Sequence, residues 1–223
     1  MNIDFHAHIL PGADHGSDGI KTSLRQLELA RLAGIDCVVA TPHFYPTEDT
    51  VRRFLDRRAN AADMLRSHLS GDVPQIRIGA EVTLCAGMDH MEGVEALCIA
   101  GTKVILIELP RCDWQPELLE SLENLRSRCG LTIVLAHIDR YDKKEVDALL
   151  EAGFLFQLNA DAIVRRFGRG RWRALLQSGG CAGIGSDIHG TKIGYSNFTR
   201  AREIYKDQWD TVMQFSRGLL SES

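Results

Sequence analysis

Several features that would assign a protein to a particular class are missing from this chain. Its six cysteines are scattered singly, without a C-x-x-C pair, so neither a thiolate zinc site nor a dithiol redox motif is indicated. No stretch approaches the roughly 20 apolar residues of a membrane-spanning helix. The N-terminus has no basic region followed by a long apolar run, as a signal peptide would. We therefore expect a reduced, cytoplasmic protein without direct membrane insertion.

Signals for nucleotide and nucleic-acid binding are also missing. The glycines of GIGSDIHG lack the spacing of a phosphate-binding loop or a dinucleotide motif, and they end a predicted strand-helix unit instead of opening one. The formal net charge is −4, from 26 Lys and Arg residues against 30 Asp and Glu residues. Bulk electrostatics therefore give no reason to expect a nucleic acid or a membrane surface as partner.

Short apolar runs rich in β-branched residues alternate with segments of helical apolar spacing. The runs predict seven strands, at residues 2–9, 36–41, 75–84, 103–109, 131–137, 154–159 and 181–187. The helical spacing predicts helices at residues 23–34, 50–69, 116–130, 143–153 and 198–215, with an irregular or short helical crossover at 88–100.

This alternation predicts an α/β fold with parallel strands and right-handed crossovers. Two architectures could hold the elements: a distorted seven-stranded parallel β/α barrel or an open doubly wound sheet. No Pro/Gly/Ser-rich linker and no repeat divides the chain, so residues 1–223 are expected to form a single domain.

The stretch HAH near the N-terminus is the first indication of a metal site. His6 and His8 occupy alternate positions of the first predicted strand, so their side chains lie on the same face. Both imidazoles could therefore reach one ion.

Nearly every other predicted strand also ends in a residue able to bind a metal. These residues are His43, Glu81, Glu108, His137, Asn159, and Asp187 with His189. In β/α barrels the carboxyl ends of the strands meet on one face, where active sites are built. A single histidine at a strand end is usually structural, but its recurrence from strand to strand favours one shared metal centre.

The types of ligand narrow the choice of ion. Histidine and carboxylate without cysteine suit zinc, manganese or iron. The number of candidates exceeds what one ion needs, which favours two or three divalent ions with a carboxylate bridging a pair. Clustered cations would let Glu81, Glu108 and Asp187 share a small space without raising each other's pKa. Such a site can produce hydroxide from bound water near neutral pH and neutralise phosphoryl oxygens.

The order H-x-H, TPH, GAE, strand-end His and SD-x-H resembles that of the PHP (polymerase and histidinol phosphatase) superfamily, from residue 3 to about residue 190. Within it, HAHILPGADHG, ATPHFYPTEDTVRRFLDRR, LIELP and LAHIDRY resemble the bacterial CpsB-like family. The resemblance implies a distorted seven-stranded β/α barrel with a trinuclear centre, in a manganese-dependent protein-tyrosine phosphatase. Iron or zinc are the alternative ions.

The same resemblance implies a partner. It would be a phosphotyrosine-bearing bacterial tyrosine kinase that controls capsule and exopolysaccharide synthesis. A homo-oligomer is left open.

Matching the motifs residue by residue places the implied metal ligands in three sets. They are His6, His8, Glu81 and Asp187; Glu81, Glu108 and His137; and His15, His43 and His189. The resemblance also implies that Arg140, in HIDR, binds the phosphate and takes part in catalysis. Independently, a guanidinium fork beside a strand-end metal site suits phosphate; the alternative is a surface loop arginine.

Two positions depart from the family pattern. His15 stands in DHG where the family usually has an aspartate, so we expect ion binding with altered affinity or metal preference, and Asp14 as a supporting or loop residue. Gly194 stands where the family often has an arginine. Lys192 could supply substrate-binding charge there, but as a point charge and not as a fork.

The run RRFGRGRWR, at residues 165–173, is strongly basic in a chain of net negative charge. It has two interpretations. It could receive an anionic substrate, such as a phosphorylated tail with neighbouring acidic groups, or it could be a solvated loop and helix face. Trp172 is interpreted as a packing residue.

Three functional hypotheses follow. The first is a metal-dependent phosphatase acting on protein phosphotyrosine. The second is a phosphatase of a small metabolite, such as histidinol phosphate or a sugar phosphate, and is motivated by Gly194. The third is a catalytically weak regulator that binds a membrane-associated kinase.

Overall fold

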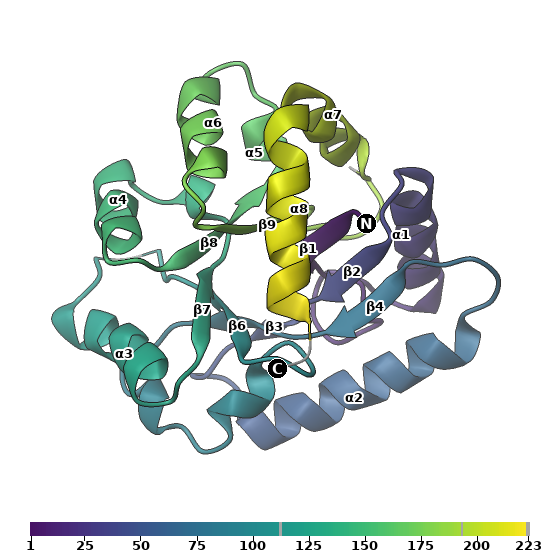
Figure 1. The fold of residues 1–223 in the computed structure, drawn as a ribbon. Helices are drawn as coiled ribbons and strands as arrows, with labels where there is room; N and C mark the ends of the chain where they lie inside the picture. The colour runs from purple at the N-terminus through teal and green to yellow at the C-terminus, as the bar shows by residue number, and fades with distance from the viewer. Residues whose placement is uncertain (112, 193, 222–223) are drawn as a thin grey trace.

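The computed structural model describes residues 1–111, 113–192 and 194–221. Helices surround a group of central strands (Figure 1). All pairings between named strands are parallel, which confirms the predicted α/β fold with parallel sheets. The cysteines within the described ranges are free thiols, as expected, and Cys112 lies outside those ranges.

Each of the seven predicted strand regions contains at least one strand. The strands are β1 (Ile3–Ala7), β2 (Cys37–Ala40), β3 (His43–Phe44), β4 (Gln75–Ile78), β5 (Glu81–Thr83), β6 (Val104–Glu108), β7 (Thr132–Leu135), β8 (Leu155–Asn159) and β9 (Cys181–Gly185). The sequence VILIE of β6 illustrates why they form, because its run of branched apolar residues is almost wholly buried between neighbouring strands.

The predicted strand at residues 75–84 is interrupted, and the short strand β3 lies beyond the strand predicted at residues 36–41. β2 and β3 are separated at Thr41 and Pro42, where proline has no amide hydrogen to donate. β4 and β5 are separated at Gly79 and Ala80. The strands therefore form a three-stranded sheet, β1-β2-β4, and a six-stranded sheet, β3-β5-β6-β7-β8-β9. The single closed barrel of seven strands is not confirmed.

The two sheets nevertheless meet at β1 and β9. The Asp187 amide donates to the His6 carbonyl at 2.8 Å, and Ala7 and Ile188 form an isolated parallel bridge. At the other junction, β3 and β5 pair His43 with Glu81 in register. These connections gather the carboxyl ends of strands from both sheets.

The first four helices follow the predictions, whereas the next two, at residues 160–163 and 169–177, were not predicted. The helices are α1 (Ile20–Leu32), α2 (Val51–His68), α3 (Pro116–Ser127), α4 (Lys143–Glu151), α5 (Ala160–Ile163), α6 (Arg169–Gln177), α7 (Ser196–Ile204) and α8 (Lys206–Leu220), with short 3₁₀ turns at Met88–His90, Val94–Leu97 and Ile138–Arg140. The single helix expected at residues 198–215 is wrong. The chain breaks at Tyr205, whose φ of −116° and ψ of 28° are not helical.

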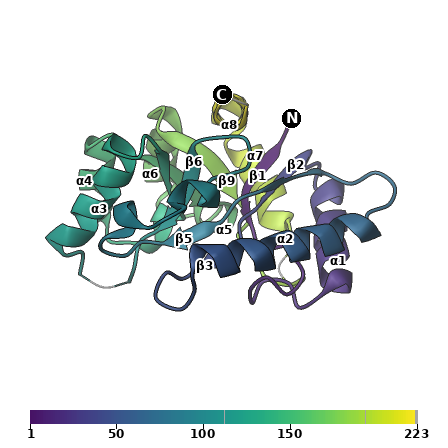
Figure 2. The same ribbon diagram turned by 90° about the horizontal axis from the view of Figure 1, so that it is seen from below.

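Helix α8 covers the amino ends of β1 and β9. Met213 Sδ accepts from the Ile3 amide at 3.2 Å, and Ser216 Oγ donates to the Ala182 carbonyl at 2.6 Å. Figure 2 shows α8 and the N-terminus on one side of the molecule. The opposite, carboxyl ends of the strands carry the predicted metal ligands. Within the described ranges, no helix combines the length and apolar character needed to cross a membrane.

Candidate metal centre

His6 and His8 form the centre of the site. Both side chains are buried, and their Nε2 atoms lie 3.0 Å apart. His6 Nδ1 lies 3.2 Å from Gln157 Oε1, which also accepts from the His137 amide at 2.7 Å. Because a backbone N–H can only donate, Gln157 presents its oxygen here, and His6 Nδ1 must carry a proton. His8 Nδ1 likewise donates to Asp14 Oδ2 at 2.7 Å.

Both imidazoles are therefore protonated on the side away from the cluster. In their neutral forms the Nε2 lone pairs of His6 and His8 point toward each other at 3.0 Å, which is repulsive without a cation between them. Other buried atoms in the cluster have no hydrogen-bond partner among the described residues: His43 Nδ1, Glu81 Oε2 and His189 Nε2. Converging, unpartnered N and O donors of this kind fit divalent metal ions.

Glu81 connects the two sides of the cluster. Its Oε2 lies 3.2 Å from Nε2 of both His6 and His8 and 3.0 Å from His43 Nδ1, and its Oε1 lies 2.7 Å from His137 Nε2. Burial opposes the charged form, but the neighbouring imidazoles outweigh it and hold the pKa of Glu81 well below its usual value. The carboxylate can therefore bridge two ions.

The pKa values of Glu108 and His43 indicate that a cation would complete the cluster. Burial and the neighbouring Glu81 charge raise the pKa of Glu108. Burial lowers the pKa of His43 to about 3, so its imidazole is neutral and keeps a lone pair for coordination. A bound cation would favour the ionised form of Glu108, and the neutral imidazole of His43 would coordinate it.

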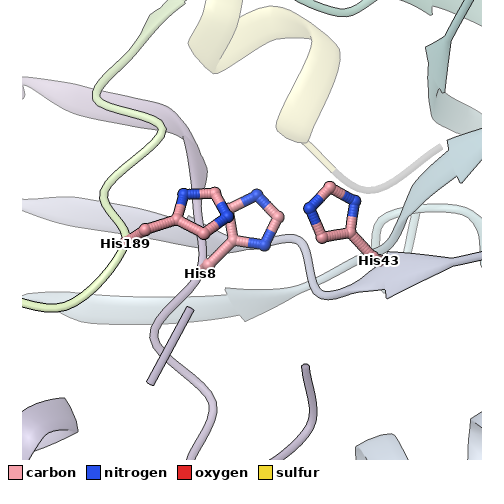
Figure 3. A group of neighbouring side chains, drawn as sticks. All are labelled: His8, His43 and His189. Atoms are coloured by element: carbon pink, nitrogen blue, oxygen red, sulfur yellow. The ribbon is translucent and has the colours of Figure 1, made fainter. Parts of the chain in front are cut away.

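Four groups of residues bring ligand atoms within 4.8 Å of one another: His8, His43 and His189; His6, His8 and Asp187; His6, Glu81 and His137; and His43, Glu81 and Glu108. The structure therefore brings together all the predicted metal ligands except His15. Figure 3 shows the first group, whose three rings come from separate segments of the chain. The His8 and His189 rings lie 4.1 Å apart, and the His8 and His43 rings 4.4 Å apart, between centroids.

His15 lies at the edge of the cluster. Its exposed ring is 4.8 Å from the His43 ring and 4.7 Å from the His189 ring, measured between centroids. It does not join any of the four groups found among the described residues. In the group that contains His43 and His189, the third member is His8, in the place that the family resemblance gives to His15.

Arg140 lies beside the cluster at the end of a 3₁₀ turn. Its guanidinium forms an ion pair with Asp187, and 35% of its side chain is exposed. Asp187 Oδ1 also lies 3.4 Å from His8 Nε2, so Asp187 connects the arginine to the cluster. Lys192 lies farther out, exposed, on a hollow that it lines with His15 and His189. Gly194 lines a different hollow, which it shares with Arg140 and Asp187.

Gln157 was not predicted from the sequence, and Asn159 was predicted only as a residue able to bind a metal. Gln157 Nε2 donates to Asn159 Oδ1 at 2.9 Å, and Asn159 Nδ2 donates to Asp187 Oδ2 at 3.0 Å. Asn159 therefore orients Asp187 and does not present its oxygen to the cluster. The available signal was the buried polar pair at alternate positions of β8, whose side chains share a face.

The backbone is unusual at two of the candidate ligands. His137 has a φ of 31° and Asp187 a φ of 51°, and they are the two non-glycine residues with positive φ in the described part of the chain. Such conformations cost energy and are concentrated at functional sites.

Comparison with known proteins agrees with this geometry. Residues 2–214 match the family model for capsular polysaccharide synthesis, CpsB/CapC. The chain belongs to this family. It is 30% identical to the tyrosine-protein phosphatase YwqE of Bacillus subtilis, over 91% of this chain and 82% of that protein. It is 27% identical to the tyrosine-protein phosphatase CpsB of Streptococcus pneumoniae, over 84% of this chain and 82% of that protein.

Solved structures show the same fold. One, from work on YwqE of Bacillus subtilis and CpsB of Streptococcus pneumoniae, described as unique metal-dependent tyrosine phosphatases, matches with a TM-score of 0.79 at 20% identity, over 99% of this chain and 95% of that one. A TatD-like protein of Archaeoglobus fulgidus matches with a TM-score of 0.57 at 13% identity, over 96% of this chain and 99% of that one.

Proposed function

We propose that this member of the CpsB/CapC family is a metal-dependent protein-tyrosine phosphatase. The observation that carries the proposal is the pair of Nε2 atoms of His6 and His8, which face each other at 3.0 Å beside Glu81 and Asp187. This arrangement suits a multinuclear metal centre, and Arg140 beside it supplies a fork for phosphate.

The nine predicted ligands would hold two or three divalent ions, with manganese the expected metal and iron or zinc the alternatives. His6, His8, Glu81 and Asp187 would hold one ion, and Glu81 would be shared with a second at Glu108 and His137. His43 and His189 would hold the third, together with His8 or His15. Bound ions would neutralise phosphoryl oxygens and lower the pKa of coordinated water.

The protein's own residues would position the substrate. Arg140 is the residue expected to bind the phosphoryl oxygens, because its guanidinium is already held beside the cluster through Asp187. Lys192 would add a point charge from the hollow that it lines with His15 and His189. The phenol of phosphotyrosine has a reference pKa of about 10, so it leaves more readily than an alkoxide and needs less help from a general acid.

The proposal includes the architecture and the biological setting. Residues 1–223 would act as a single domain whose two sheets surround the site. With β2 and β3 counted as one strand, and β4 and β5 as another, the sheets would form the expected distorted seven-stranded barrel. The substrate would be a phosphotyrosine-bearing protein, and we expect it to be a cytoplasmic tyrosine kinase of capsule or exopolysaccharide assembly. The description of the family, capsular polysaccharide synthesis, supports the capsule setting.

A substrate comparison tests the proposal. The purified manganese-loaded protein should hydrolyse a phosphotyrosyl peptide faster than histidinol phosphate or a sugar phosphate. His6→Ala and His137→Ala should remove most of this activity, whereas His68→Ala, at an exposed position of α2, should not change it. Faster turnover of the metabolites would assign the site to small-molecule phosphates. Full activity in both cluster variants would exclude the metal-centre mechanism.

Arg140 is tested separately. Arg140→Lys keeps the positive charge and loses the fork, so we expect a KM for phosphopeptide raised by about tenfold, equivalent to about 1.4 kcal/mol. Arg66→Lys, an exposed arginine of α2 paired with Asp63, is the matched control. An unchanged KM in Arg140→Lys would remove Arg140 from phosphate binding.

A further inference from the structure

A second hollow adjoins the metal centre on the side of Arg140. The hollow nearest the cluster, of about 310 Å³, is lined by Arg140, Asp161, Asp187 and His189 among others. Its neighbour, of about 620 Å³, is also bordered by Arg140 and Asp161 and extends to Arg111, Arg165, Phe167 and Trp172. Because two residues border both hollows, a chain with its phosphate at Arg140 would be led into the larger one.

The larger hollow presents cationic groups that a ligand can reach. Arg111 is exposed and has no carboxylate within 4.0 Å among the residues that the structure describes. Arg165 pairs with Asp161 at 3.0 Å, but the two side chains are 71% and 46% exposed. Exposed ion pairs are weak, so a ligand carboxylate can compete for Arg165. Asp139 also lines the hollow, but its carboxylate accepts a hydrogen bond from the backbone amide of Asn159 at 3.0 Å and, among the described residues, does not pair with an arginine of the hollow.

Phe167 adds an apolar contact among these charges. Its side chain is 91% exposed, more than any other large apolar side chain in the described ranges. It lies between α5 and α6, directly before Gly168, whose φ is +85°. Trp172 is partly buried and packs against the core below, as predicted. An aromatic ring exposed beside a charged hollow is typical of a binding surface.

Three other arginines of the basic run make contacts within the protein. Arg171 pairs with Asp147 at 3.1 Å, Arg169 donates to the Val164 and Arg165 carbonyls, and Arg173 lies over the Tyr205 ring. The run is therefore neither wholly a solvated face nor wholly a docking surface. Arg165, Phe167 and Trp172 are the members that line the hollow, and Arg165 and Phe167 are the exposed ones.

We propose that the hollow of Arg111, Arg165 and Phe167 binds the polypeptide that flanks a phosphotyrosine, with an acidic side chain on the arginines and an apolar side chain on Phe167. This inference rests on the proposed function and adds a preference for acidic sequences around the phosphotyrosine. The preference comes from charge complementarity and from the continuity of the hollow with the phosphate position at Arg140.

Three substrates test the inference with the manganese-loaded protein of residues 1–223. Two are phosphotyrosyl peptides that differ only in having Glu or Lys at the flanking positions, and the third is p-nitrophenyl phosphate, which has no flank. The unmodified protein should have a higher kcat/KM for the Glu peptide. The double variant Arg111→Glu, Arg165→Glu should lose about five- to tenfold on the Glu peptide, through KM, and gain on the Lys peptide.

The same variant should retain its rate on p-nitrophenyl phosphate, which shows that the metal centre is intact. Phe167→Ala should raise KM for both peptides without changing the small substrate. Arg217→Glu, an exposed charge reversal on α8 at the opposite end of the strands, is the matched control and should change none of the three.

Other outcomes overturn the inference in distinguishable ways. Equal losses on all three substrates would place the arginines in the catalytic centre. A second outcome is normal turnover of both peptides without discrimination between them, and variants whose peptide kinetics equal those of the unmodified protein. It would overturn this inference and leave the proposed function intact. Hydrolysis of metabolite phosphates without peptide turnover would overturn the proposed function itself.

A membrane surface is the competing occupant for basic and aromatic side chains. Co-sedimentation with vesicles of phosphatidylserine and phosphatidylcholine distinguishes the two. Binding to these vesicles that is lost in Phe167→Ala, together with peptide kinetics unaffected by all the variants, would assign the surface to lipid and overturn the inference.

Discussion

The carboxylate of Asp14 holds the imidazole of His8 at 2.7 Å, through Oδ2 and Nδ1. The same carboxylate accepts from the Gly16 amide at 2.8 Å and from the His43 amide at 2.9 Å. Burial disfavours its charge, but His8 and the two amides outweigh burial and hold the pKa of Asp14 far below its usual value. Asp14 thus orients one candidate ligand and fixes the backbone of another.

Replacing Asp14 by asparagine should weaken metal binding without unfolding the protein. Asparagine keeps the shape of the side chain but loses the negative charge that supports the His8 imidazole. We expect manganese affinity to fall by about 10- to 100-fold, which is usual for a lost carboxylate partner of a metal-bound histidine. Titration calorimetry of Asp14→Asn against Asp63→Asn, an exposed site on α2, measures this. Equal affinities in the two variants would show that Asp14 does not support the ligand.

His15 should contribute to only one of the ions. Its ring is exposed at the edge of the cluster, near His43 and His189, so its removal leaves the buried groups around Glu81 in place. His15→Ala should lower the affinity of the weakest-bound ion by about tenfold and leave the others unchanged, and His15→Asp should recover part of the loss. Elemental analysis after dialysis against graded manganese concentrations counts the ions. Unchanged occupancy in His15→Ala would make His8 the third ligand of that group.

Removal of metal should destabilise the fold. Without ions, the facing Nε2 atoms of His6 and His8 and the neighbouring Glu81 and Glu108 carboxylates remain in a buried cluster. Ions that bind only the folded state add about 2.7 kcal/mol at a concentration 100 times Kd. The urea midpoint should therefore rise from EDTA to manganese, and potassium at the same ionic strength should not raise it. Equal midpoints in EDTA and manganese would contradict a metal centre in this cluster.

Gly16 should tolerate no side chain. A Cβ placed there would lie 2.1 Å from His8 Cβ and 2.8 Å from the His8 carbonyl oxygen, so the histidine would have to move. We expect Gly16→Ala to cost about 1–3 kcal/mol of unfolding free energy and to weaken metal binding. Gly218→Ala, in α8 with nothing within 4 Å, should be neutral or stabilising by up to about 1 kcal/mol. Urea unfolding of both variants tests the contrast, and equal effects would exclude the clash.

Local patterns in the sequence were enough to predict most of the elements and the region of the site. The seven strand regions follow from runs of branched apolar residues, and parallel strands place their carboxyl ends together. His43, Glu81 and His137 could therefore be assigned to one centre although they are distant in the chain. Their residue types also indicated metal and phosphate chemistry.

Other features depend on contacts that no local pattern contains. The interruptions at Pro42 and Gly79 and the break at Tyr205 arise where separate segments compete for the same space. The side-chain oxygen of Gln157 lies between His6 and His137, because separate segments also compete for the same hydrogen bonds. A buried donor must find its partner in three dimensions, and its distance along the chain does not say where. The sequence by itself determined the strand regions, the helices up to α4 and the kinds of ligand. Only the tertiary structure decided which atoms face one another, because those positions follow from the packing of the whole chain.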